Sequence, residues 1–360
     1  MRKKVIVVVG ARPQFIKAAV VSKALADHSA LEEIIVHTGQ HFDDNMSRVF
    51  FEQMGIPQPR HNLAIGGGSH GQNTGRMIEA LEGVILAEQP AAVLVYGDTD
   101  STLAGAIATS KLNIPLAHVE AGLRSFNRRM PEEINRVLTD HVSDLLFAPS
   151  ESAVANLHSE GVAPPKIKLV GDVMFDAVQA FTEVAKREST ILADLALAPK
   201  SYALVTIHRK ENTDDDARLS AFIEGLSQSP FPIVLPLHPR TRKRIADHGL
   251  TFPAHFSLID PVGYLDMMAL ESSAAVIATD SGGVQKEAYF HGVPCITLRD
   301  ETEWVELVDI GANVLVGADK VALSNAFTQT RTAEPVAKRD IYGDGSSSRQ
   351  IAAGLLEYLS

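Results

Sequence analysis

The sequence predicts an α/β protein built from two Rossmann-like domains, each with a doubly wound parallel sheet. The chain has 360 residues, 45% of them hydrophobic. This length is too great for one ordinary core and suits two domains of roughly 150 to 200 residues each. Short runs of β-branched residues alternate with longer segments of helical period, which is the pattern of βαβ units. Two such domains imply a cleft between them.

The first domain is expected over residues 1–185. Its clearest strand is residues 92–96, because Val93-Leu94-Val95-Tyr96 is an almost continuous apolar run, as in parallel strands buried on both faces. Further strands are expected at residues 4–9, 33–37, 116–119, 145–148 and 168–170, with helices between them.

The second domain is expected over residues 186–342. The pattern weakens in the acidic, alanine-rich stretch at 186–200, which we interpret as the crossing between domains. Strands then follow at residues 202–206, 233–235, 256–259, 275–278, 295–298 and 313–316. Residues 343–360 contain a final helix, expected at 346–358, for which packing against the first domain is one possibility.

Composition excludes several classes of function. The net charge of −11 argues against a nucleic-acid surface, although a local basic pocket for one small anion is compatible with it. No run of about 18 apolar residues occurs, and Gly10 interrupts the first apolar stretch early, so we expect a cytoplasmic protein without a membrane segment. The single cysteine, Cys295, excludes an intrachain disulfide and a thiolate zinc site. We interpret it as a buried strand residue.

Ligands of open α/β sheets bind beyond the carboxyl ends of the strands. The first strand runs into Gly10-Ala11-Arg12-Pro13, and Lys17 follows one turn later. The start of a helix offers free N–H groups and the positive dipole end, and Arg12 and Lys17 add full charge, so this turn is a candidate anion site. A solvated loop charge is the alternative for Arg12. The turn lacks GxGxxG, which makes a nicotinamide dinucleotide site a weak reading.

Carboxylates follow neighbouring strands of the first domain. Asp98 lies just beyond strand 92–96 and Glu120 just beyond strand 116–119, while Pro131 opens a helix that begins with Glu132 and Glu133. First-turn acids also serve as helix-dipole partners, and Asp100 or Ser101 is expected to cap a helix at 102–111. Acids converging at one sheet edge should raise the pKa of at least one of them, which suits proton transfer at carbon.

The second half repeats this logic. His208 follows a strand and precedes two cations, and His238 is a similar strand-end histidine, so both are candidates for the substrate site, with a structural role as the alternative. The strongest local signal is Ser281-Gly282-Gly283, where a strand ends and a helix starts at once. Its amides could approach a diphosphate, and Glu287 further along could accept both hydroxyls of a ribose. A left-handed turn before a capped helix is the alternative.

Together these residues resemble the non-hydrolysing UDP-N-acetylglucosamine 2-epimerase family over nearly the whole chain. The motifs that carry the resemblance are Gly10-Ala11-Arg12-Pro13 with Lys17, Gly97-Asp98-Thr99, His118-Val119-Glu120-Ala121-Gly122-Leu123-Arg124, Pro131-Glu132-Glu133 with Asn135-Arg136, Thr279-Asp280-Ser281-Gly282-Gly283-Val284-Gln285 with Glu287, and Tyr342-Gly343-Asp344-Gly345.

The resemblance implies a GT-B type fold with the active site in the interdomain cleft, a homodimer, and interconversion of UDP-GlcNAc with UDP-ManNAc for surface polysaccharides. It implies neither NAD nor an essential metal. By position, the residues that look catalytic are Asp98, Glu120, Glu132 and His208. Those that look like nucleotide or phosphate contacts are Arg12, Lys17, Arg136, Ser281, Gly282, Gly283 and Glu287.

Three stretches depart from the usual family pattern. Gln14 replaces the glutamate of the usual Arg-Pro-Glu. The usual Thr-Glu-Arg-Pro-Glu is replaced by Thr302-Glu303-Trp304-Val305-Glu306, and residues 66–71 differ from the common form. These features resemble the branch that epimerises UDP-2,3-diacetamido-2,3-dideoxyglucuronate, which is the alternative substrate.

The main rival function is a GT-B glycosyltransferase. It would use the same glycine turn but needs an acceptor surface, and the sequence shows no basic amphipathic segment of that kind. A non-catalytic UDP-sugar sensor is a third class, which would not require several acids at strand ends.

Overall fold

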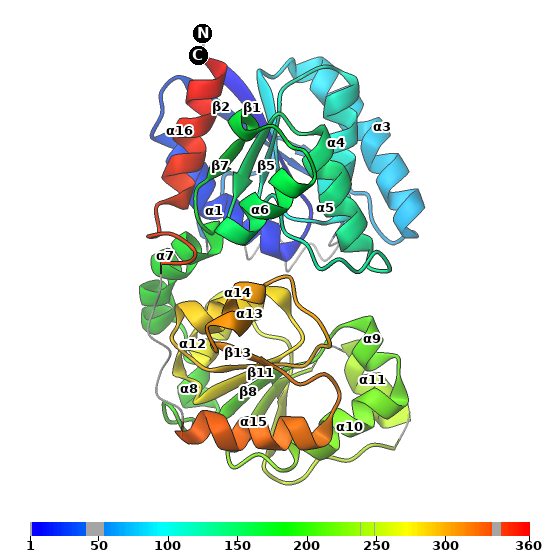
Figure 1. The fold of residues 1–360 in the computed structure, drawn as a ribbon, viewed down its shortest axis with the longest axis vertical. Helices are drawn as coiled ribbons and strands as arrows, with labels where there is room; N and C mark the ends of the chain where they lie inside the picture. The colour runs from blue at the N-terminus through cyan, green and yellow to red at the C-terminus, as the bar shows by residue number, and fades with distance from the viewer. Residues whose placement is uncertain (1, 41–53, 238, 248, 333–339) are drawn as a thin grey trace. The chain divides into compact units, whose positions relative to one another are not determined.

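The computed structural model describes residues 2–40, 54–237, 239–247, 249–332 and 340–360 (Figure 1). The chain forms two compact units, Met1–Ala177 with Asp340–Ser360, and Val178–Arg339. The division falls inside helix α7 (Val173–Glu188). The sequence pattern weakens only beyond residue 186, because a continuous amphipathic helix carries the chain out of the first unit and gives no break in period.

The first unit contains a fully parallel seven-stranded sheet in the order β3-β2-β1-β4-β5-β6-β7. Its strands are β1 (Lys3–Val9), β2 (Leu31–His37), β3 (His61–Asn62), β4 (Ala92–Tyr96), β5 (Leu116–Val119), β6 (Leu145–Ala148) and β7 (Ile167–Leu169). The predicted strands are present within two residues of their expected bounds. The two-residue strand β3 was not predicted, because so short a segment has no detectable period.

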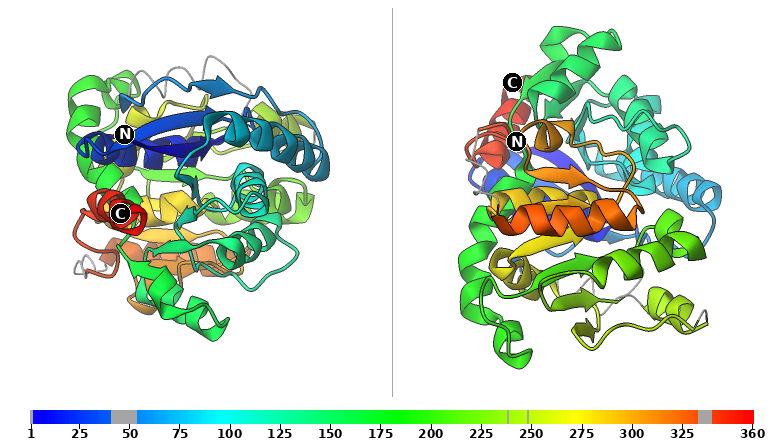
Figure 2. Two further views of the ribbon diagram at one scale, coloured as in Figure 1. Left: turned by 90° about the horizontal axis from the view of Figure 1, so that it is seen from above. Right: turned by 60° about the horizontal axis from the view of Figure 1, so that its bottom comes forward.

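Helices cover both faces of this sheet, as Figures 1 and 2 show. They are α1 (Arg12–Ala26), α3 (His70–Glu88), α4 (Asp100–Lys111), α5 (Pro131–Val142), α6 (Glu151–Ser159), the first part of α7, and α16 (Ser347–Leu359), with a short 3₁₀ turn at Pro164–Lys166. Every residue of β4 is buried because the strand is covered on both sides.

The carboxy-terminal helix α16 belongs to the first unit and packs against α1 (Figure 1). Its first turn is held by the buried Asp176 of α7, whose carboxylate accepts the N–H groups of Ser347 at 3.1 Å and Ser348 at 2.7 Å. A carboxylate at a helix N-terminus satisfies free amides and complements the dipole. Helix α16 is therefore anchored by α7, a helix far from it in the sequence.

The second unit contains a parallel six-stranded sheet in the order β10-β9-β8-β11-β12-β13. Its strands are β8 (Ala203–Thr206), β9 (Ile233–Pro236), β10 (Phe256–Ile259), β11 (Val276–Thr279), β12 (Cys295–Thr297) and β13 (Asn313–Leu315). Its helices are α8 (Ile191–Asp194), α9 (Lys210–Thr213), α10 (Asp216–Leu226), α11 (Pro239–Asp247), α12 (Tyr264–Ser273), α13 (Gly282–Phe290), α14 (Val305–Asp309) and α15 (Lys320–Thr332). Cys295 is buried in β12, as predicted.

Among the helices of the described ranges, none combines the length and the apolar character that crossing a membrane requires.

Candidate active site

The loops after β1, β4 and β5 lie side by side, because these three strands are adjacent in the first sheet. Arg12 is the first residue of α1, where Pro13 occupies an early helical position as predicted. Lys17 lies further along the same helix and is buried. Asp98 follows β4 and Glu120 follows β5 directly. The topology therefore brings these predicted site residues to one edge of the sheet.

Lys17 and Glu120 form a buried ion pair, in which the ammonium donates a hydrogen bond to Oε2 of the carboxylate. The backbone of Gly97 lies against this ion pair. A β-carbon at position 97 would lie 3.2 Å from Glu120 Oε2 and 3.5 Å from Lys17 Nζ, and the residue has φ +61°. Glycine is therefore required at 97 both for its conformation and for the approach of the pair.

Asp98 is held by Arg136, which donates from Nε at 3.0 Å and Nη2 at 2.7 Å to Oδ2. The same guanidinium donates from Nη1 to Glu133 Oε2 at 2.6 Å, and its side chain is 3% exposed. Asn135 adds a hydrogen bond to the backbone carbonyl of Asp98 at 2.9 Å. Arg136 was predicted to contact phosphate, but here its donors bind carboxylates.

The two acids that follow Pro131 have different surroundings. Glu133 is buried and accepts the amides of Ser125 and Phe126, each at 2.9 Å. Burial alone would raise the pKa of Glu133, but these amides and Arg136 together hold it below the usual value. Glu132 is half-buried and makes no hydrogen bond or ion pair with the described residues. Of the two acids, Glu132 is the one available to a ligand.

The expected crowding of like charges is not what the structure shows at Asp98 and Glu120. Each carboxylate faces a cation, Arg136 or Lys17, in place of another carboxylate. A group with a raised pKa occurs elsewhere in this unit, at Glu33 of β2. The sequence correctly groups the acids, but the pairing cations lie on helices whose orientation cannot be read from strand positions.

Gln14 connects the loops of this edge and was not predicted as a site residue. Its Oε1 accepts the amides of Gly10 at 2.7 Å and Ala11 at 3.0 Å. Its Nε2 donates to the Tyr96 carbonyl at 2.9 Å and to the Thr99 and Thr102 hydroxyls at 3.0 Å. The only sequence signal for this role is that a polar side chain stands one turn into a helix that is otherwise buried.

The helix after β4 begins earlier than predicted and has a different cap. Helix α4 starts at Asp100, and the Thr99 hydroxyl accepts the amide of Thr102. The expected cap, Asp100 or Ser101, is therefore wrong. Asp100 instead lies 2.8 Å from His70 Nδ1, and its other oxygen is 3.4 Å from Asn135 Nδ2. Thr99 is the cap because it precedes the first helical turn, where its hydroxyl can accept the amide of the third helical residue, Thr102.

In the second unit, Ser281 caps α13 by accepting the amide of Val284 at 3.4 Å, and the helix begins at Gly282. Gly282 and Gly283 both have φ outside the left-handed region, so the alternative of a left-handed turn is wrong. A β-carbon at 282 would lie 2.5 Å from Glu303 Oε1. Glycine is needed there for space. Glu287 is buried within the same helix.

His208 is held at the end of β8 by Asp280, which follows the adjacent strand β11. The fully buried carboxylate accepts the amides of His208 and Arg209, each at 3.0 Å, and the Asn212 side chain at 3.0 Å. Oδ1 of Asp280 lies 3.2 Å from His208 Nδ1, which leaves Nε2 of the half-exposed ring as the nitrogen for a ligand. Asp280 was quoted only as part of a motif, although its strand-end position was the available signal. His238 lies outside the described residues.

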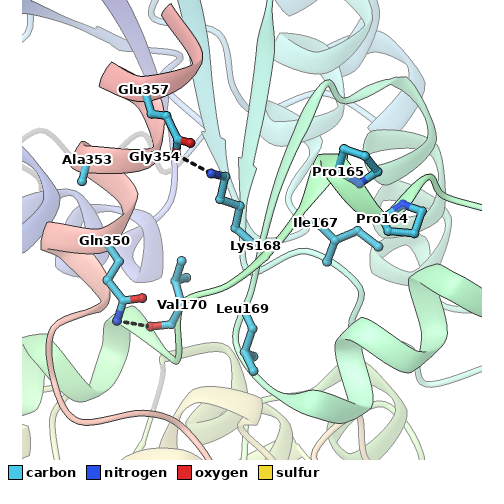
Figure 3. Close-up of a pocket in the computed structure, with 10 residues that line it drawn as sticks. All are labelled: Pro164, Pro165, Ile167, Lys168, Leu169, Val170, Gln350, Ala353, Gly354 and Glu357. Atoms are coloured by element: carbon cyan, nitrogen blue, oxygen red, sulfur yellow. Dashed lines mark hydrogen bonds and ion pairs between the residues drawn. The ribbon is translucent and has the colours of Figure 1, made fainter. Parts of the chain in front are cut away.

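Figure 3 shows a pocket along the seam between the edge strand β7 and helix α16. Lys168 reaches Glu357 at 2.5 Å and Gln350 donates to the Val170 carbonyl at 3.4 Å. None of the predicted site residues lines this pocket. We therefore place the candidate chemistry at the strand ends.

Comparison with known proteins identifies the family of the chain. Residues 23–356 match the family model described as UDP-N-acetylglucosamine 2-epimerase. A UDP-2,3-diacetamido-2,3-dideoxy-D-glucuronate 2-epimerase of Pseudomonas aeruginosa is 53% identical over 365 residues, covering 99% of each chain. A UDP-N-acetylglucosamine 2-epimerase of Methanocaldococcus jannaschii is 43% identical over 358 residues, covering 97% of each.

Solved structures give the same answer. The Methanocaldococcus jannaschii enzyme in complex with UDP-GlcNAc and UDP superposes with a TM-score of 0.92, covering 99% of each chain at 43% identity. The Neisseria meningitidis UDP-GlcNAc 2-epimerase bound to UDP-GlcNAc has a TM-score of 0.91 at 33% identity, covering 98% of this chain and 100% of that one. The predicted fold class is confirmed. The chain belongs to the UDP-N-acetylglucosamine 2-epimerase family and is an isomerase.

Proposed function

We propose that this protein inverts the configuration at C2 of a UDP-2-acetamido sugar by eliminating UDP and adding it back. The observation that carries the proposal is the set of acids formed by Asp98 and Glu120 at adjoining strand ends and Glu132 in the first turn of α5, in a chain of this family. A protein that only bound the nucleotide would not need them. We assign the nucleotide contacts to the helix start at Ser281 and to the buried Glu287.

The chemistry explains why both kinds of residue are needed. The C2 proton of a sugar is not acidic, so direct abstraction would be too slow. If a base removes this proton while the C1–O bond to UDP breaks, a C1=C2 double bond forms and the products are a glycal and UDP. The UDP oxygen then adds back to C1 as C2 is protonated on the opposite face. Overall, one proton leaves and one is returned, and no redox cofactor takes part.

We assign the acids to the proton transfers, and Arg12, His208 and the helix-start amides to the leaving group. Asp98, Glu120 and Glu132 supply base and acid on the two faces of the sugar. Arg12, the amides at Gly282 and Gly283, and the Nε2 side of His208 stabilise the charge that develops on the departing diphosphate. Lys17 and Arg136 instead orient Glu120 and Asp98, because those are their partners in the structure.

We propose UDP-2,3-diacetamido-2,3-dideoxyglucuronate as the preferred substrate, with UDP-GlcNAc as the second candidate. The support is the 53% identity to the Pseudomonas aeruginosa enzyme of that name, against 43% to the Methanocaldococcus jannaschii UDP-GlcNAc 2-epimerase. The test is kcat/KM for the two sugars measured side by side. A higher value for UDP-GlcNAc would reverse the assignment and leave the reaction type unchanged.

The reaction type is tested in deuterated water. Elimination and readdition introduce solvent deuterium at C2 of the product, and product without deuterium would reject the scheme. Asp98→Asn should bind UDP nearly as tightly as the wild type in calorimetry and lose turnover. Asp194→Asn, at an exposed position at the end of helix α8, is the matched control and should leave both unchanged. Wild-type turnover in Asp98→Asn would remove Asp98 from the mechanism.

We further propose that the protein is a homodimer. Ile134 and Leu138 lie one turn apart on α5 and are 45% and 43% exposed. We assign these two side chains to the contact with the second chain, in line with the homodimer that the family resemblance implies. Light scattering coupled to gel filtration should give twice the 38.8 kDa chain mass. A single-chain mass at micromolar concentration would exclude the dimer.

A further inference from the structure

His118, in the centre of β5, is fully buried and has no role in the mechanism above. Both of its ring nitrogens are in hydrogen-bond contact. Nδ1 lies 2.7 Å from Asp140 Oδ1, and Nε2 lies 2.8 Å from the backbone carbonyl oxygen of Gly97. The partners come from two different elements, helix α5 and the turn after β4.

These contacts define the protonation state of the ring. A neutral imidazole has one N–H donor and one acceptor nitrogen. The Gly97 carbonyl can only accept, so Nε2 must carry a hydrogen. An ionised Asp140 can also only accept, so Nδ1 must carry one as well. With both nitrogens donating, the ring is an imidazolium.

The alternative is a neutral ring that accepts a proton from a protonated Asp140. The other oxygen of Asp140 argues against it, because Oδ2 accepts the amide of Gly122 at 3.0 Å and Arg124 Nη1 at 2.7 Å. The carboxylate form is therefore the one the site favours.

The remaining charges balance the cluster. Arg124 also donates from Nε at 2.8 Å and from Nη2 at 2.7 Å to Glu160. The groups His118, Asp140, Arg124 and Glu160 thus alternate in sign, which is how buried charges are tolerated in a protein interior. The fold compensates a positive His118.

We propose that His118 is a positioning residue that donates from both ring nitrogens and so fixes the two turns carrying Asp98 and Glu120. Its Nε2–H holds the carbonyl of Gly97, the residue that precedes Asp98. Its partner Asp140 holds the amide of Gly122, two residues beyond Glu120. One charged pair therefore fixes the backbone beside both acids. The catalytic importance of this arrangement rests on the proposed function. The charge of the ring does not depend on it.

The charge is tested by nitrogen NMR of the intact protein labelled with ¹⁵N-histidine. The His118 signals are assigned by their loss in His118→Gln or, if that variant does not fold, by through-bond connection to the backbone. At pH 7.5 both ring nitrogens should show protonated shifts and attached hydrogens, because both face acceptor oxygens. A neutral ring at pH 7.5 would overturn the proposal. The measurement needs no substrate, so its result is independent of the proposed reaction.

The positioning role is tested by kinetics on folded protein. In His118→Gln we expect kcat to fall about 10- to 100-fold, the loss expected for one hydrogen bond to a charged group, with KM and the Kd for UDP within about threefold of wild type. Asp140→Asn, which removes the counterion, should show the same pattern. A purely structural role would lower the melting temperature and leave kcat of the folded fraction unchanged, and that result would refute the positioning role.

Discussion

Replacing Gln14 with alanine should destabilise the first unit strongly, because this side chain makes hydrogen bonds to segments outside its own helix. The side chain is 1% exposed and makes five hydrogen bonds to three segments. In the alanine variant, the buried amides of Gly10 and Ala11 lose the acceptor they have now. The Tyr96 carbonyl still accepts from the Thr102 hydroxyl at 2.6 Å.

The expected loss follows from these orphaned groups. A buried donor left unsatisfied costs about 1–3 kcal/mol, so two of them cost about 2–6 kcal/mol. For a unit of this size, 1 kcal/mol shifts the melting temperature by about 2–4 °C, which gives a drop of roughly 10 °C for Gln14→Ala. Because Gln14 also ties the loop of Arg12 to the loop of Asp98, kcat/KM should fall in the same variant.

Gln14→Glu is the matched control, since glutamate is the usual family residue by resemblance. One carboxyl oxygen can still accept the amides of Gly10 and Ala11. The other can donate to the Tyr96 carbonyl only when protonated, and burial at this position favours the protonated form, so this variant should be close to wild type at pH 5 and lose stability as the pH rises. Differential scanning calorimetry at pH 5 and pH 8 measures both variants. Equal melting temperatures for the alanine and glutamate variants at pH 5 would refute the reasoning.

Two other substitutions test separate features. Burial raises the pKa of Glu33 from 4.5 to about 7, against the smaller opposite effect of the Ser22 hydroxyl. The stability that comes from the neutral acid is present below pH 4.5 and lost as the pH rises through 7, so the buried charge costs up to about 3 kcal/mol above it. Glu33→Gln should therefore raise the calorimetric melting temperature at pH 8.5 and change it little at pH 4.5, and no gain at pH 8.5 would contradict the buried charge. Gly97→Ala should cost about 1–2 kcal/mol for its φ of +61° and lower kcat, because the new methyl presses on the Glu120 carboxylate beside Lys17, with UDP affinity unchanged; unchanged kcat would show that the pair tolerates the methyl.

Much of the fold could be predicted because its parallel strands are buried on both faces. Such strands are short, mainly apolar runs, and residues 92–96, 116–119 and 145–148 were predicted with the bounds the structure has. The division between the units was less accessible. Helix α7 crosses it without a change of period, and neither composition nor turn residues mark the position where the contacts change sides.

The site was predictable as a set of positions and not as a set of contacts. Strand-end logic located Asp98 and Glu120 because both are defined by where a strand stops. It could not pair them, because Arg136 and Lys17 reach them from helices α5 and α1, and the rotation of a helix about its axis is decided by packing. The need for glycine at 282 was equally hidden, since it comes from the carboxylate of Glu303, 21 residues later in the sequence.

Glu120 shows why such a site needs support from the layer behind it. Its φ of +73° is unusual for a residue with a side chain and costs on the order of 1–3 kcal/mol. The chain is held in this turn because the amides of Glu120 and Ala121 both donate to the Phe147 carbonyl, each at 3.1 Å. The turn directs the carboxylate to Lys17, and Gly122 beyond it is fixed by Asp140. Strain at the reacting acid is thus balanced by β6 and by the charged cluster around His118, which is why changes in that buried layer should alter kcat while leaving nucleotide binding in place.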